Sequence, residues 1–80
     1  MHELGLSRNI ASIVRENAGG RPVARVRLAI GPLACVEIRA LQFCWNIVTE
    51  GSPLAGAKLE IVEAEADTFL IREFEFEEVA

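Results

Sequence analysis

The sequence predicts an α+β domain in which two helices pack on one face of a three-stranded sheet, in the order α-β-α-β-β. Three observations predict it. The chain has 80 residues, enough for a single domain spanning residues 1–80. Two segments place apolar residues at helical spacing, and three others alternate apolar and polar residues. Glycine and proline stand at several of the junctions between them.

The first element predicted is a helix over residues 3–17. Its apolar stripe is spaced at i, i+4, i+7 and i+8, and consists of Leu6, Ile10, Ile13 and Val14. Gly19 and Gly20 then supply a left-handed cap. A strand over residues 23–30 follows, with Val26, Leu28 and Ile30 on one side and Arg25, Arg27 and Ala29 on the other.

Helical spacing returns over residues 36–49, after Gly31 and Pro32 have ended the strand. The expected apolar stripe is Val36, Ala40, Leu41, Cys44, Ile47 and Val48. Phe43 and Trp45 flank it. They could be exposed contacts, but a domain this small needs its aromatic area in the core, so we assign both to the core.

The last two elements are strands over residues 57–61 and 69–79. The short polar link between them suggests an antiparallel hairpin. The alternation of the final strand changes parity midway, which predicts a bulge near Arg72 and Glu73. The acidic run Glu73, Glu75, Glu77 and Glu78 is expected to be a solvated face opposed to Arg25 and Arg27 if those strands are neighbours. A docking surface for a basic partner is the alternative.

The composition of the chain disfavours several classes of function. A net charge of −4 disfavours nucleic-acid binding, which would need a basic stripe. No secretory signal and no apolar run of membrane-spanning length is visible, and two cysteines are too few for a disulfide-rich secreted domain, so we expect a cytoplasmic protein without membrane partners. Free sheet edges in so small a domain leave a homodimer open.

The N-terminus carries the candidate chemistry. His2 is the only histidine, and its bulk leads us to expect that Met1 is retained with a free α-amine. That amine, with an unperturbed pKa near 8, the imidazole and adjacent backbone amides can form a four-nitrogen set. Such a set suits Ni(II) or Cu(II) better than Zn(II). The alternative is a solvent-exposed histidine on a loose end.

Several segments, in order along nearly the whole chain, resemble the nickel-binding domain of the HypA/HybF family of hydrogenase nickel-insertion proteins. Met1-His2-Glu3-Leu4 and the turn Val48-Thr49-Glu50-Gly51-Ser52 are the most specific together. The others are residues 26–33, 36–43, 53–61 and 71–77.

The resemblance implies a nickel metallochaperone that binds Ni(II) through the Met1 amine, the His2 side chain and the backbone nitrogens of His2 and Glu3. The Glu3 side chain could add a carboxylate or simply favour the helix N-terminus. The implied partners are a hydrogenase large subunit precursor and an accessory GTPase, and some members also serve urease.

The chain departs from the family between the second and third strands, where members carry a zinc domain with two CxxC pairs. Residues 61–69 close that interval directly, so the family's zinc site is expected to be absent. Cys44 reads as a core residue, whereas Cys35 is more open; a disulfide or a two-thiol metal site lacks support from the spacing.

No catalytic constellation or phosphate-binding loop is apparent, so we expect a protein that is not an enzyme. The alternative to metal delivery is a metal-free interaction or scaffold domain of the same fold.

Overall fold

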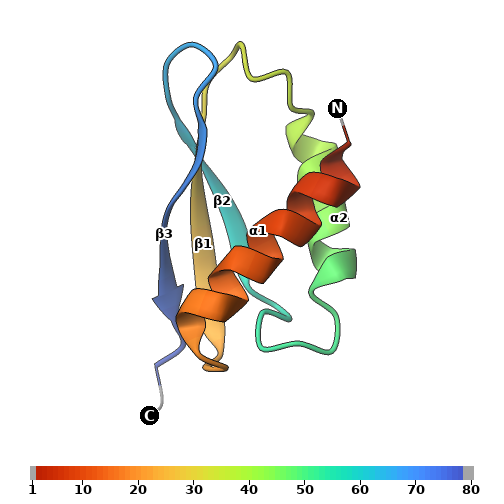
Figure 1. Ribbon diagram of the computed structural model, residues 1–80, viewed down its shortest axis with the longest axis vertical. Helices are drawn as coiled ribbons and strands as arrows, with labels where there is room; N and C mark the ends of the chain where they lie inside the picture. Colours follow the sequence, from red (N-terminus) through yellow and green to blue (C-terminus); the bar gives the residue numbers. More distant parts are fainter. Residues whose placement is uncertain (1, 79–80) are drawn as a thin grey trace.

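The computed structural model describes residues 2–78, and its elements follow the order α-β-α-β-β. They are α1 (Glu3–Ala18), β1 (Val23–Ile30), α2 (Ile38–Val48), β2 (Lys58–Glu63) and β3 (Phe69–Phe76) (Figure 1). The predicted fold class is therefore confirmed. Val79, the predicted end of the last strand, lies outside the described residues.

Helix α1 forms where the sequence predicts it, and its end has the expected cause. Gly19 takes a left-handed conformation with φ 62°, which caps the helix. Ile10 and Val14 are buried, but Ile13, predicted for the apolar stripe, is 49% exposed. Ser7, which is not one of the four residues of that stripe, is fully buried. Its hydroxyl donates a hydrogen bond of 3.1 Å to the carbonyl oxygen of Leu41 on α2.

The sheet has the strand order β2-β1-β3, with β1 parallel to β2 and antiparallel to β3. The predicted hairpin between the last two strands is therefore wrong, because β1 lies between them. The unit β1-α2-β2 is a crossover, which is the connection that parallel neighbours require. The link from β2 to β3 then passes the end of β1, where the backbone N–H groups of Gly31 and Leu33 donate to Thr68 and Ala66, each at 2.8 Å.

The predicted irregularity in the last strand is confirmed. Arg27 pairs with Glu73 but Leu28 pairs with Ile71, so Arg72 is an extra residue on β3. Because of this bulge, apolar residues on both sides of it reach the same face, against the core: Phe69, Ile71, Phe74 and Phe76.

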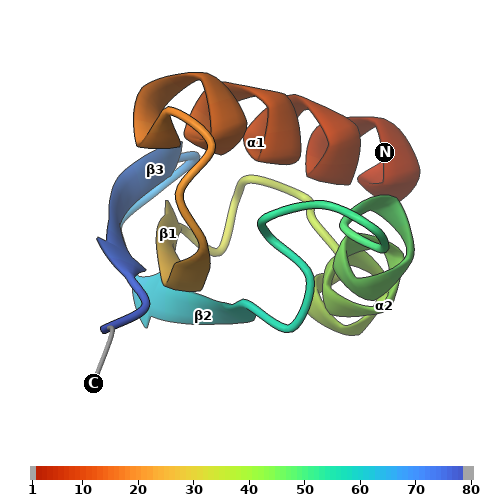
Figure 2. The same cartoon turned by 90° about the horizontal axis from the view of Figure 1, so that it is seen from below.

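Both helices lie on the same side of the sheet, and the core fills the space between them and β1 (Figure 2). Trp45 is 1% exposed and its indole N–H donates to the carbonyl oxygen of Ala57 at 3.0 Å. The core assignment of Trp45 is thus confirmed, whereas that of Phe43 is wrong, since Phe43 is 67% exposed. Ile47, also predicted for the stripe of this helix, is 48% exposed.

The other face of the sheet is polar. Arg27 bridges three strands, contacting Glu60 on β2 and both Glu73 and Glu75 on β3. The hydrogen bonds to Glu75 and Glu73 raise the pKa of Arg27, and the hydrogen bond from Arg27 lowers the pKa of Glu75. The prediction that part of the acidic run opposes Arg25 and Arg27 is confirmed. None of the helices within residues 2–78 is long and apolar enough to cross a lipid bilayer.

Candidate metal centre

His2 lies immediately before α1, at the end of the molecule marked N in Figure 1. It occupies the N-cap position, and its carbonyl oxygen accepts a hydrogen bond from the N–H of Leu6 at 3.0 Å. Its side chain makes no capping hydrogen bond and is exposed to solvent. The backbone of His2 is therefore held by the helix while the imidazole is left available to a ligand.

The carboxylate of Glu3 contacts the N-terminal end of α2. Oε2 accepts a hydrogen bond of 3.1 Å from the backbone N–H of Glu37, the N-cap residue of α2. This bond, followed by one from the backbone N–H of Glu3 itself, lowers the pKa of the carboxyl group. The first turn of α1 is thereby tied to the first turn of α2. The carboxylate of Glu3 is therefore engaged in holding the two helices together.

The structure therefore describes two of the three residues predicted to bind the metal, His2 and Glu3. His2 and Glu3 are consecutive at the start of a helix, and both are anchored through their own hydrogen bonds. Met1, whose α-amine completes the predicted set, lies outside the described residues. Within residues 2–78, no three side chains of histidine, cysteine, aspartate or glutamate cluster closely enough to hold a metal ion.

Cys35 and Cys44 are not joined by a disulfide. Both are free thiols. Cys35 is exposed in the loop before α2, where its Sγ lies 3.5 Å from the carbonyl oxygen of Leu33. Cys44 is half-buried on α2, at the margin of the core that the sequence predicted for it. The link between β2 and β3, residues 64–68, contains no cysteine.

Sequence reasoning missed the contact between Glu3 and Glu37. These residues are 34 positions apart, and no local pattern relates them. It also missed a cleft along α1 that is lined by Arg8, Arg15 and Arg21. The sequence does hold one signal for that cleft, because Arg8 and Arg15 are seven residues apart, or close to two helical turns.

Three relatives illustrate how much of this sequence is shared. A hydrogenase maturation factor HypA of Trichodesmium erythraeum is 48% identical over 63 residues, covering 79% of this chain and 55% of that protein. The HypA of Rippkaea orientalis is 49% identical over 63 residues, which also cover 79% of this chain and 55% of that protein. That of Azotobacter vinelandii is 46% identical over 66 residues, covering 79% of this chain and 58% of the relative. The chain thus spans little more than half the length of these relatives.

The fold also matches a solved structure, the solution structure of the Ni metallochaperone HypA from Helicobacter pylori. The TM-score is 0.73 at 18% sequence identity, and the match covers 99% of this chain and 74% of that one. At this identity the likeness concerns the fold, and it includes β3.

A family model for HypA, described as hydrogenase/urease nickel incorporation, metallochaperone, matches residues 1–69. That match covers both helices, the first two strands and the start of the chain at which the candidate ligands stand. This chain therefore belongs to the HypA family of hydrogenase and urease nickel-incorporation metallochaperones.

Proposed function

We propose that this chain binds one Ni(II) ion at its N-terminus and delivers it during the maturation of a [NiFe]-hydrogenase. The ligands are the α-amine of Met1, the imidazole of His2 and the backbone nitrogens of His2 and Glu3. The observation that carries the proposal is the state of His2: it is the only histidine, its side chain is exposed, and its main chain is fixed at the start of α1.

The chemistry of this donor set supports nickel. Four nitrogens close in sequence suit a square-planar dication, and Ni(II) accepts that geometry more readily than Zn(II), which prefers four tetrahedral ligands. Binding displaces protons from these nitrogens, so the affinity falls as the solution becomes acidic. The ion is cargo, and a site at the exposed end of the molecule leaves it within reach of a receiving protein.

The engaged carboxylate of Glu3 also supports the arrangement. Its hydrogen bond to Glu37 fixes the first helical turn, so the main-chain nitrogens of the ligand set start from a defined position. A site ordered in advance loses less conformational entropy on binding than one on a loose terminus.

The receiving partner is a hydrogenase large subunit precursor, and an accessory GTPase of nickel insertion cooperates in the transfer. The names of the relatives, which are hydrogenase maturation factors, support this choice. The work of the chain is binding and transfer in the cytoplasm, without catalytic turnover.

Isothermal titration with nickel chloride tests the site. Three forms are compared with the unaltered chain: His2→Ala, a chain with one glycine placed before Met1, and a control with one glycine placed after Ala80. Intact mass measurement first establishes that Met1 is present and unblocked. We expect the first two forms to lose at least about tenfold in affinity and to lose the absorption band of square-planar nickel, while the control keeps both.

Unchanged nickel affinity in His2→Ala and in the N-terminally extended form would refute the site. Delivery is tested separately by capture of a hydrogenase large subunit precursor with and without nickel. Capture that is indifferent to His2 and to nickel would instead identify a metal-free interaction domain of the same fold.

A further inference from the structure

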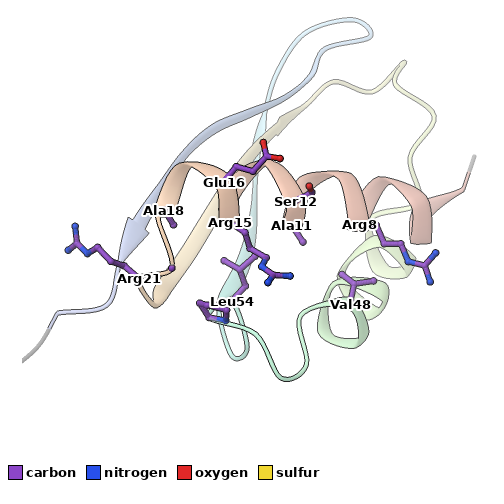
Figure 3. A pocket seen from close by; sticks show the side chains of 11 residues that line it. Arg8, Ala11, Ser12, Arg15, Glu16, Ala18, Arg21, Val48 and Leu54 are labelled. Carbon is purple, nitrogen blue, oxygen red and sulfur yellow. The ribbon is translucent and has the colours of Figure 1, made fainter.

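A cleft of about 480 Å³ runs along α1 on the side that faces the connection between α2 and β2. Figure 3 shows its lining residues, with Arg8, Arg15 and Arg21 following one another along its length and Leu54 below Arg15. Arg8 and Arg15 belong to α1, and Arg21 follows the Gly19-Gly20 turn. The cleft shares none of its lining residues with the candidate metal centre.

The cleft is positively charged although the chain as a whole is negative. Three arginines line it, and Glu16 is the one acidic residue among the lining side chains described. Within residues 2–78, the ion pairs to carboxylates involve Arg25 and Arg27, on the far face of the sheet. The three guanidinium groups of the cleft are therefore not neutralised by carboxylates of the described chain, and they are available to an external anion.

The spacing of the arginines favours an elongated anion over a single small one as the ligand. Seven residues of α-helix separate Arg8 from Arg15, a rise of about 10 Å. Arg21 is held farther along, because its guanidinium carbon lies 3.7 Å from the centre of the Phe76 ring. Side chains that start this far apart are better matched by an elongated ligand, with negative charges about 10 Å apart, than by one phosphate or carboxylate.

The floor of the cleft distinguishes between elongated anions. It is aliphatic, formed by Ala11, Val48, Pro53 and Leu54, of which Ala11 and Leu54 are buried. Proteins that bind single-stranded nucleic acids usually combine positive charge with aromatic side chains on which bases stack, and the described lining contains no aromatic residue. An aliphatic floor beside a row of arginines suits a polypeptide that carries both carboxylates and small apolar side chains.

We propose that this cleft binds an extended acidic segment of a partner protein, with its carboxylates on Arg8, Arg15 and Arg21 and an apolar side chain over the half-buried Val48 and Pro53. Charge complementarity identifies the occupant: three unneutralised guanidinium groups on a chain of net charge −4 select for an anion at this face and repel it elsewhere. The proposal does not rest on the nickel site.

Fluorescence anisotropy with a synthetic peptide tests the proposal. The probe is a fluorescein-labelled peptide of four Glu-Val-Pro repeats, whose extended polyproline-type conformation places glutamates on one side about 9 Å apart. A Lys-Val-Pro peptide of equal length controls for apolar binding, and a labelled thymidine oligonucleotide of equal length controls for general polyanion binding. We expect saturable binding of the acidic peptide, weakened by added salt, and at least about tenfold weaker binding of both controls.

Charge reversal locates the site. The double variant R8E/R15E is compared with R72E, which reverses an exposed arginine on β3 outside the cleft. The double variant should bind the acidic peptide at least about tenfold more weakly, whereas R72E should stay within about twofold of the unaltered chain. Circular dichroism checks that both are folded.

A second measurement needs no variant. Nuclear magnetic resonance of the unaltered chain should show the acidic peptide shifting the backbone amide signals of Ala11, Ser12 and Leu54 but not that of Arg27. Failure of the acidic peptide to bind, equal loss in R72E, stronger binding of the oligonucleotide, or shifts confined to other faces would each overturn the proposal. Loss of nickel binding in His2→Ala would not contradict the proposal for the cleft, because the two sites share no residues.

Discussion

The carboxylate of Glu3 accepts a hydrogen bond from the backbone N–H of Glu37, and this 3.1 Å contact joins the N-terminal ends of the two helices. The N-terminal turns of α-helices carry unpaired N–H groups and a partial positive charge, so a carboxylate is favoured there. One side chain therefore serves the first turns of α1 and α2 at once. The residue adjacent to the only histidine is consequently among the anchored positions of the chain.

Removing the charge of Glu3 should lower stability at neutral pH and have little effect in acid. The hydrogen bonds lower the pKa of this carboxyl group below 4.5, its usual value. Because the pKa is lower in the folded state, the stabilisation is complete above the unfolded value and is lost as the pH falls through the folded one.

Thermal unfolding of Glu3→Gln and of the unaltered chain, at pH 7 and at pH 3, measures this. We expect a Tm lower by at most a few degrees at pH 7 and a smaller difference at pH 3. Glu50→Gln serves as the control, because Glu50 is exposed and its carboxylate makes no hydrogen bond within the described residues. A deficit in Glu3→Gln that grows in acid would contradict the assignment.

Trp45 and Phe43 should respond oppositely to truncation although both are aromatic residues of α2. Trp45→Ala removes a side chain that is 1% exposed and bonded to Ala57, at a cost of about 3–5 kcal/mol. Phe43→Ala changes a side chain that is 67% exposed and should alter stability by about 0.5 kcal/mol or less. Urea unfolding followed by circular dichroism measures both; similar losses would show that Phe43 is covered.

Ser7 should tolerate a smaller side chain better than a larger one. Its hydroxyl is fully buried between the helices and donates to the Leu41 carbonyl oxygen. Ser7→Ala loses that hydrogen bond, at about 1 kcal/mol. Ser7→Val adds volume where the helices are in contact and should cost about 1–3 kcal/mol beyond it. Denaturant midpoints give the order, and a valine variant as stable as the alanine variant would indicate a looser helix interface.

Two glycines should respond to alanine with opposite signs. A Cβ atom on Gly31 would lie 2.2 Å from the carbonyl oxygen of Ala66, in the turn that carries the chain across the end of β1. Gly31→Ala should therefore destabilise by about 2–3 kcal/mol. Gly5 lies within α1 with space around it, so Gly5→Ala should stabilise by about 0.5–1 kcal/mol. Equal effects in equilibrium unfolding would contradict the packing at Gly31.

The local elements follow from the sequence because their causes are local. The alternation over residues 23–30 gives the bounds of β1, and the glycine pair after residue 18 gives the end of α1. The parity change near Arg72 locates the bulge, since a strand must keep its apolar side chains on the buried face. The first three residues suggest a metal site through their own chemistry, and this part of the function stays a prediction.

Only the tertiary structure decided which surfaces meet. The order β2-β1-β3 contradicts the expected hairpin, because the crossover through α2 places β2 beside β1 and leaves the other edge of β1 to β3. The spacing of apolar residues shows which side of a helix faces the core, but not how much of the helix surface a neighbouring element covers. Ile13 and Phe43 are therefore exposed while Ser7 is buried. Glu3 meets Glu37 across 34 residues for the same reason. Contacts between distant segments depend on the packing of whole elements, whereas periodicity records the preferences of each element alone.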